Sequence, residues 1–171
     1  GLVMSLIKRV DMRMSKGRRV SELDLDNVEQ MAKDFAAAGR HVDAPQWRSK
    51  HMFPRLQLLQ KLPHRTVYDL GNGYMVKFPQ RSRGWTYNRR EAEVWIEASD
   101  AEREHLVPIL KMDWAGTWLL MPTVELAAPD AQPSAETARV LAELHVQNVT
   151  AQDLTVDGRV FHYGDVETPK E

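Results

Sequence analysis

Apolar residues at helical spacing predict three helices in this chain. The first covers residues 21–39, where Ser21 is a good N-cap and the apolar positions between Leu23 and Phe35 form one broad stripe. The second covers residues 86–104. The third is SAETARVLAELH, residues 134–145, which begins with its own capping serine. Each of these helices is followed by a segment of shorter period.

Three strand pairs are predicted in those segments. TVYDL and YMVKF, within residues 66–78, flank an Asn-Gly step that supplies the positive φ values of a tight hairpin turn. HLVPILKMDW and TWLLMPTVEL flank Ala115-Gly116, and residues 148–165 form a third hairpin around Asp157-Gly158. Residues 56–62 are apolar and fit either a helix or a strand. The alternation of helices and hairpins predicts an α+β fold with an antiparallel sheet.

A single lysine, Lys77, lies inside the strand YMVKF. On its own it fits a solvated strand face, but the helix that follows changes this interpretation. Glu91, 14 residues later, falls on the apolar face of that helix, whereas Glu93 falls on the polar face. An inward carboxylate costs several kcal/mol unless it is paired, so we expect Lys77 and Glu91 to form a semi-buried pair. The apolar face also carries Tyr87, Val94, Trp95 and Ala98.

The strand lysine, the helix glutamate and the next two strands together resemble the protein-kinase fold, in its compact phage and prokaryotic form. The resemblance is carried by MVKFP, NRREAEVW and HLVPIL…WLLMPTVEL, and it extends over residues 56–167. It implies that Lys77 holds nucleotide phosphates, that Glu91 fixes the lysine, and that hinge backbone groups bind adenine. The implied hinge residues are Leu120, Met121 and Thr123, and the implied cofactors are ATP and Mg²⁺.

The resemblance leaves two registers open for the catalytic segment. In the first, ELHVQN matches a DLHxxN form, which implies Glu143 as the base and Asn148 with Asp165 as metal ligands. His162 could instead occupy the position of the metal-binding Asp. In the second register, Asp153 matches the catalytic Asp, with Ala151 and Gln152 in place of the family's His and Arg. We favour the first register, because a helix ending near His145 and followed by a hairpin fits it.

Two departures from the family pattern predict impaired catalysis. The segment before the lysine strand has no glycine until Gly71, so the glycine-rich phosphate loop is missing. Few residues follow GDVE, so the C-lobe is expected to be reduced. We therefore divide the chain into a basic, helical N-terminal extension (1–55), a kinase-like N-lobe (56–122) and a truncated C-lobe (123–171). The predicted function is weak nucleotide binding or a regulatory role.

Composition adds two alternatives. Six basic residues in Ile7–Arg19 suggest RNA or DNA binding, although no aromatic residues are interleaved for stacking. A protein partner is also expected, because a kinase-like scaffold without nucleotide can act as a regulatory or inhibitory module.

No apolar run approaches the ~20 residues of a membrane helix. With no cysteine to indicate a compartment, a cytoplasmic location is the default expectation.

Overall fold

The computed structural model describes residues 57–70, 73–80, 82–113, 116 and 118–167. These residues form an α+β fold with a five-stranded antiparallel sheet and three α-helices. The chain divides into two compact units. Of the described residues, the sheet unit contains those up to Asn88 and those within 109–123, and the second unit contains those within 89–108 and from Val124 to Glu167. The predicted helix over 21–39 and the basic extension lie outside the described residues.

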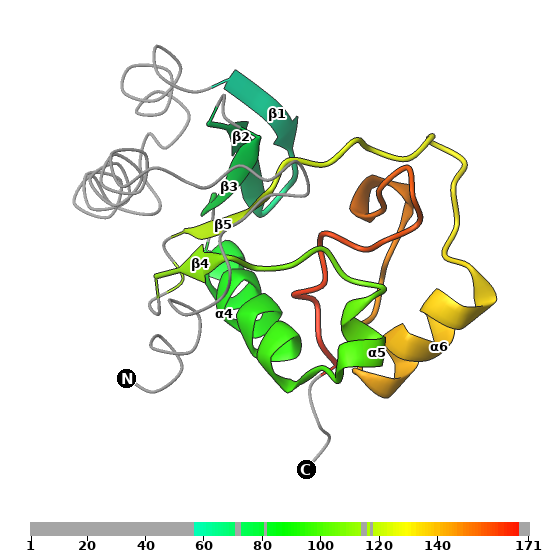
Figure 1. Ribbon diagram of the computed structural model, residues 1–171. Coiled ribbons are helices and arrows are strands. Elements are labelled where there is room, and N and C mark those ends of the chain that lie inside the picture. The colour runs from blue at the N-terminus through cyan, green and yellow to red at the C-terminus, as the bar shows by residue number, and fades with distance from the viewer. Residues whose placement is uncertain (1–56, 71–72, 81, 114–115, 117, 168–171) are drawn as a thin grey trace. The chain divides into compact units, whose positions relative to one another are not determined.

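The sheet has the strand order β1-β2-β3-β5-β4 (Figure 1). Its strands are β1 (Gln57–Lys61), β2 (Arg65–Asp69), β3 (Tyr74–Pro79), β4 (Lys111–Met112) and β5 (Leu119–Pro122). The first two predicted strand pairs are confirmed, since β2 pairs with β3 and β4 pairs with β5, both antiparallel. The ambiguous segment before them is strand β1, which pairs with β2 at one edge.

The centre of the sheet is buried on both faces. Every residue of β3 is buried, and on the neighbouring strand Val67 and Tyr68 are at most 1% exposed. The rings of Tyr68 and Phe78 meet edge-on, with centroids 6.1 Å apart. A strand buried on both faces must carry apolar residues at consecutive positions, as YMVKF does. Its one lysine is therefore placed in the core of the sheet unit.

The second predicted helix is two helices in the structure. Helix α4 (Ser82–Glu97) begins four residues earlier than predicted, and α5 (Asp100–Arg103) follows it. The break occurs at Ser99, whose hydroxyl accepts the Glu102 N–H while the Glu102 carboxylate accepts the Ser99 N–H, which makes a capping box. Arg103 then donates hydrogen bonds to the carbonyls of Trp95 and Ile96 at the end of α4. These bonds satisfy carbonyls that a helix end leaves without partners.

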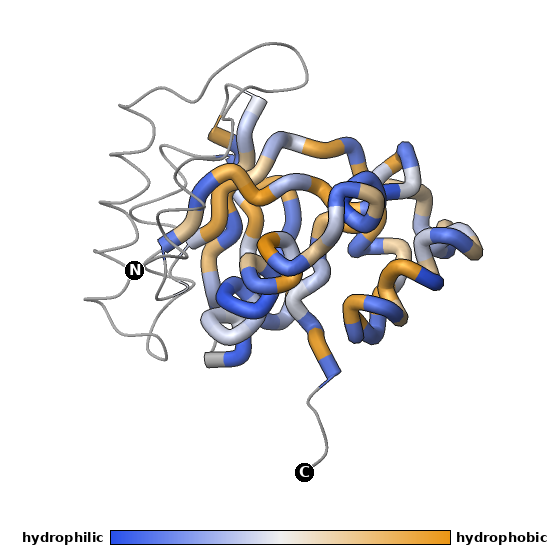
Figure 2. Tube along the Cα trace, turned by 60° about the horizontal axis from the view of Figure 1, so that its bottom comes forward, coloured by the Kyte–Doolittle hydropathy of each residue, from blue (hydrophilic) through white to orange (hydrophobic). Residues whose placement is uncertain are grey.

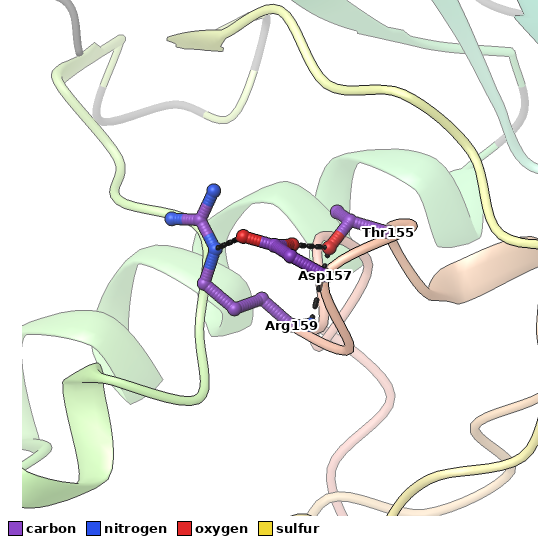
Figure 3. Close-up of polar contacts among 3 residues, drawn as sticks. All are labelled: Thr155, Asp157 and Arg159. Carbon is purple, nitrogen blue, oxygen red and sulfur yellow. Dashed lines mark hydrogen bonds and ion pairs between the residues drawn. The ribbon is translucent and has the colours of Figure 1, made fainter.

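The C-terminal part of the described chain contains α6 (Ala135–Glu143), which Ser134 caps as predicted. The third predicted hairpin is reduced to a short turn. A 3-10 helix, Ala151–Asp153, precedes it, and a single bridge joins Leu154 to Val160. The turn is held by Asp157, which accepts hydrogen bonds from the Thr155 hydroxyl and the Arg159 guanidinium (Figure 3). The Thr155 hydroxyl, and after it the Arg159 charge, lower the pKa of Asp157, against an opposing effect of burial.

Hydrophobic and polar residues alternate at short intervals along the described chain (Figure 2). In the part of the chain that the structure describes, no helix combines the length and the apolar character needed to cross a membrane.

Candidate functional site

Lys77 is fully buried, with 0% of its surface exposed. It lies in the middle of β3, opposite Val67 on one side and Leu119 on the other. A lysine on a solvated strand face would be exposed, so burial excludes that simpler interpretation. Because removing an ammonium group from water is costly, a buried lysine needs compensating polar or charged groups around it. Such a site is where a functional lysine is expected.

The backbone of the lysine strand is tied to α4 by a buried amide that the sequence analysis did not single out. Asn88 is 0% exposed, and its Nδ2 donates to the Lys77 carbonyl at 3.4 Å and to the Gly116 carbonyl at 2.9 Å. Its Oδ1 accepts a hydrogen bond from Nη1 of the buried Arg65 at 3.3 Å. The sequence contains one indication that Asn88 is buried, because it lies three residues before Glu91 and therefore on the same helix face.

Glu91 belongs to the second unit and is also 0% exposed. Its Oε1 accepts a hydrogen bond from the backbone N–H of Tyr163 at 2.5 Å. Glu93 is exposed, so the predicted helical phase is confirmed. The predicted pairing of Glu91 with Lys77 stays a prediction. A carboxylate held by a backbone N–H keeps one orientation, so Glu91 is fixed from within its own unit.

Tyr163 holds residues 162–164 in place through a second hydrogen bond. Its hydroxyl donates to the Val107 carbonyl at 2.7 Å, and its side chain is fully buried. The backbone N–H of Val107 in turn donates to the Val160 carbonyl at 2.8 Å. His162, the residue before Tyr163, is 6% exposed, and its ring lies 3.9 Å from that of Phe161. The segment that contains His162 is therefore buried and lies against Glu91.

The two predicted metal ligands, Asn148 and Asp165, lie together. Nδ2 of Asn148 donates to Oδ2 of Asp165 at 3.1 Å, and Nε2 of Gln147 donates to Oδ1 of Asp165 at 3.1 Å. Among the described residues, no group of three or more acidic or histidine side chains is arranged to hold a metal ion. Mg²⁺ requires oxygen ligands. The assignment of Asn148 and Asp165 as Mg²⁺ ligands stays a prediction, and an ion bound there would have to displace the amide N–H of Asn148 from the carboxylate.

The two candidate bases have local partners. Glu143 lies exposed in the last turn of α6. The Ser99 backbone N–H is the main group that lowers the pKa of Glu102, and the Glu143 side chain adds to this effect, so Glu143 lies beside α5. Asp153 ends the 3-10 helix, and its Oδ2 accepts hydrogen bonds from the Thr150 N–H and hydroxyl at 2.8 and 3.3 Å. Asp153 therefore has a structural role in the cap of the 3-10 helix.

The predicted hinge is strand β5 and the residue after it. Leu120 and Met121 are 0% exposed, and the Thr123 N–H donates to the Gly73 carbonyl at 2.9 Å, so this donor is already used within the sheet. The Leu120 carbonyl accepts the Leu110 N–H on the side of β4. Because backbone groups alternate in direction along an antiparallel strand, the Pro122 carbonyl points to that same side, beyond the last residue paired with β4.

Known proteins add no relative to this description. No family model, no curated protein and no solved structure matches the chain. The features that bear on function are therefore this chain's own residues, chiefly the buried Lys77 and the buried Glu91.

Proposed function

We propose that this chain is a minimal kinase-like domain that binds a nucleotide weakly and transfers phosphoryl groups slowly or not at all. The observation that supports this proposal best is the complete burial of Lys77 and Glu91, at the spacing that led to the resemblance. A chain of this size seldom buries two ionisable residues fully without a functional reason or a mutual pairing. The backbone bond from Tyr163 adds support, because it fixes the carboxylate that would in turn fix the lysine.

In the proposed complex, Lys77 neutralises phosphate charge and Glu91 orients Lys77. Leu120 and Met121 supply apolar surface beside the adenine, and the Pro122 carbonyl accepts a hydrogen bond from its amino group. Thr123 contributes less than the sequence suggested, because its N–H donates to Gly73. Its hydroxyl oxygen is buried and has no hydrogen-bond partner among the described residues. A buried hydroxyl without a partner is costly, and a polar group of a ligand would remove that cost.

The arrangement of the acidic residues supports slow or absent catalysis. Phosphoryl transfer depends almost entirely on positioning and on electrostatic stabilisation, so a base must be free to meet the substrate hydroxyl. Asp153 is engaged in the cap of the 3-10 helix, where its carboxylate accepts the Thr150 N–H. The chain also lacks the glycine-rich loop whose backbone N–H groups would hold phosphates. Affinity for adenosine and for ATP should therefore differ by less than about tenfold, or ~1.4 kcal/mol.

Calorimetric titration with adenosine and ATP tests this proposal. At a temperature at which the variant is still folded, Lys77→Met is expected to weaken ATP binding and to leave adenosine binding nearly unchanged. Lys61→Met is the matched control, because Lys61 is also a strand lysine but is exposed. The proposal fails if neither ligand binds to the folded wild-type chain. Rapid ATP turnover that is lost in Lys77→Met would disprove the catalytic part.

A protein-binding role is the second candidate. Strand β1 lies at the edge of the sheet, and its adjacent Leu58 and Leu59 are 40% and 36% exposed. An exposed apolar edge strand can pair with a strand of another chain.

The nucleic-acid alternative depends on Ile7–Arg19, outside the described residues, and a salt-dependent gel shift would detect it. A folded chain that binds neither nucleotide nor nucleic acid would favour the protein-binding role.

A further inference from the structure

Residues 145–147 and residues 165–167 form a short antiparallel pair within the second unit. Val146 and Val166 are bridge partners, the Gln147 N–H donates to the Asp165 carbonyl at 2.9 Å, and the Glu167 N–H donates to the His145 carbonyl at 2.8 Å. The Asp165 carboxylate adds two side-chain bonds to this backbone pairing. One of its oxygens accepts from Gln147 and the other from Asn148.

The paired segment has an unusual backbone. His145 has a φ of 60° and Asn148 a φ of 59°, so both ends of the turn after α6 are in the left-handed region. Residues with a side chain adopt this region at a cost, and they keep it only where surrounding contacts favour it. The Asp165 bonds hold Gln147 and Asn148, inside and at the end of this turn, and therefore supply such contacts.

The same bonds conflict with a metal site. A magnesium ion between Asn148 and Asp165 would require the amide oxygen and a carboxylate oxygen to point at the ion. Here the amide nitrogen of Asn148 points at the carboxylate, so ion binding would have to break this hydrogen bond and turn the amide over. Gln147 occupies the other carboxylate oxygen in the same way.

We propose that Asp165 is a structural clip that holds the turn after α6, and that this chain binds nucleotide without a divalent cation. The second half of this proposal rests on the function proposed above. The first half is independent of it, because the clip acts in the chain without ligand.

Thermal unfolding in buffer with EDTA tests the clip. Asp165→Ala removes both acceptors and is expected to lower the melting temperature by about 2–8 °C, the shift that corresponds to one or two lost hydrogen bonds in a chain of this size. Asp130→Ala, which changes an exposed aspartate outside helices and strands, is the control and should leave the melting temperature unchanged. An unchanged melting temperature for Asp165→Ala would overturn the clip.

Binding of Mn²⁺, followed by electron paramagnetic resonance, tests the metal directly. The wild-type chain should bind no more Mn²⁺ than Asp165→Ala at millimolar concentration, and its melting temperature should not rise with MgCl₂. Binding of Mn²⁺ that is lost in Asp165→Ala would overturn the proposal. ATP affinity should change by less than about twofold between EDTA and MgCl₂, a difference of ~0.4 kcal/mol. If ATP does not bind at all, the proposed function fails and with it the cation-free half, while thermal unfolding in EDTA still decides the clip.

Discussion

Replacing Lys77 by Met should destabilise this chain far more than the loss of one surface charge would. Both Lys77 and Glu91 are 0% exposed, and we predict that they compensate each other. Removing one partner of a buried ion pair leaves the other charge without compensation, which costs about 3–5 kcal/mol. For a chain of this size, that loss lowers the melting temperature by about 6–20 °C. Glu91→Gln should cost a similar amount, although its amide oxygen can still accept the Tyr163 N–H.

The double variant Lys77→Met/Glu91→Gln separates pairing from packing. With both charges removed, the free energy of unfolding should fall by less than either single change causes, because no unpaired charge remains. Urea unfolding followed by tryptophan fluorescence measures all three variants, since the chain has five tryptophans. The exposed residues Lys61 and Glu93 give a control cycle with the same substitutions, expected within about 0.5 kcal/mol of wild type. Additive single effects at Lys77 and Glu91 would refute the pairing, and with it the main support for the kinase-like proposal.

Two further predictions concern contacts outside the proposed site. Arg103→Ala should lower the free energy of unfolding by about 1–3 kcal/mol, because Arg103 donates to two carbonyls at the end of α4 and its guanidinium lies 4.7 Å from the centre of the Trp95 ring. Urea unfolding measures this loss against Arg139→Ala, a change on the exposed side of α6. Equal stability of the two variants would contradict the prediction. Asp157 has a pKa lowered from 3.8, so its stabilising contribution is present above about pH 4 and disappears as the pH falls through the lower folded-state pKa. Asp157→Asn should therefore flatten the acid limb of a stability-against-pH curve, and an unchanged limb would contradict the assignment.

The parts of the fold that the sequence predicted are those with a local cause. The strand pattern on either side of the Asn-Gly step predicts the pairing of β2 with β3, Ser134 caps α6, and helical phase separates the buried Glu91 from the exposed Glu93. Each of these features depends on residues a few positions apart, so a pattern in the sequence is enough to find it.

The start of α4 was missed because it depends on a distant contact. The helix includes Gly84, where a Cβ would lie 2.0 Å from the His64 carbonyl oxygen. Tertiary packing requires glycine there and overrides its low helix propensity. At Ser99 the predicted helix over 86–104 is wrong, because the S-x-x-E capping box in the sequence starts a new helix there.

The site was predicted only in part, for the same physical reason. Lys77 and Glu91 could be found because each contrasts with its apolar neighbours. The role of Tyr163 could not, since its N–H meets a carboxylate 72 positions away in the chain. The resemblance implied a metal-binding role for Asp165, which stays a prediction, and its bonds to Gln147 and Asn148 could not be predicted because their partners lie 17 or 18 positions away in the chain.

Helix α4 places a constraint on how this chain can change in evolution. Asn88 satisfies backbone carbonyls of the sheet unit, and three residues later Glu91 accepts a hydrogen bond in the second unit. Each of these two side chains is buried and hydrogen-bonded within its own unit, whereas Arg89 and Arg90 between them are only half-buried. In natural variants, Arg89 and Arg90 should therefore be replaced more readily than Asn88 or Glu91.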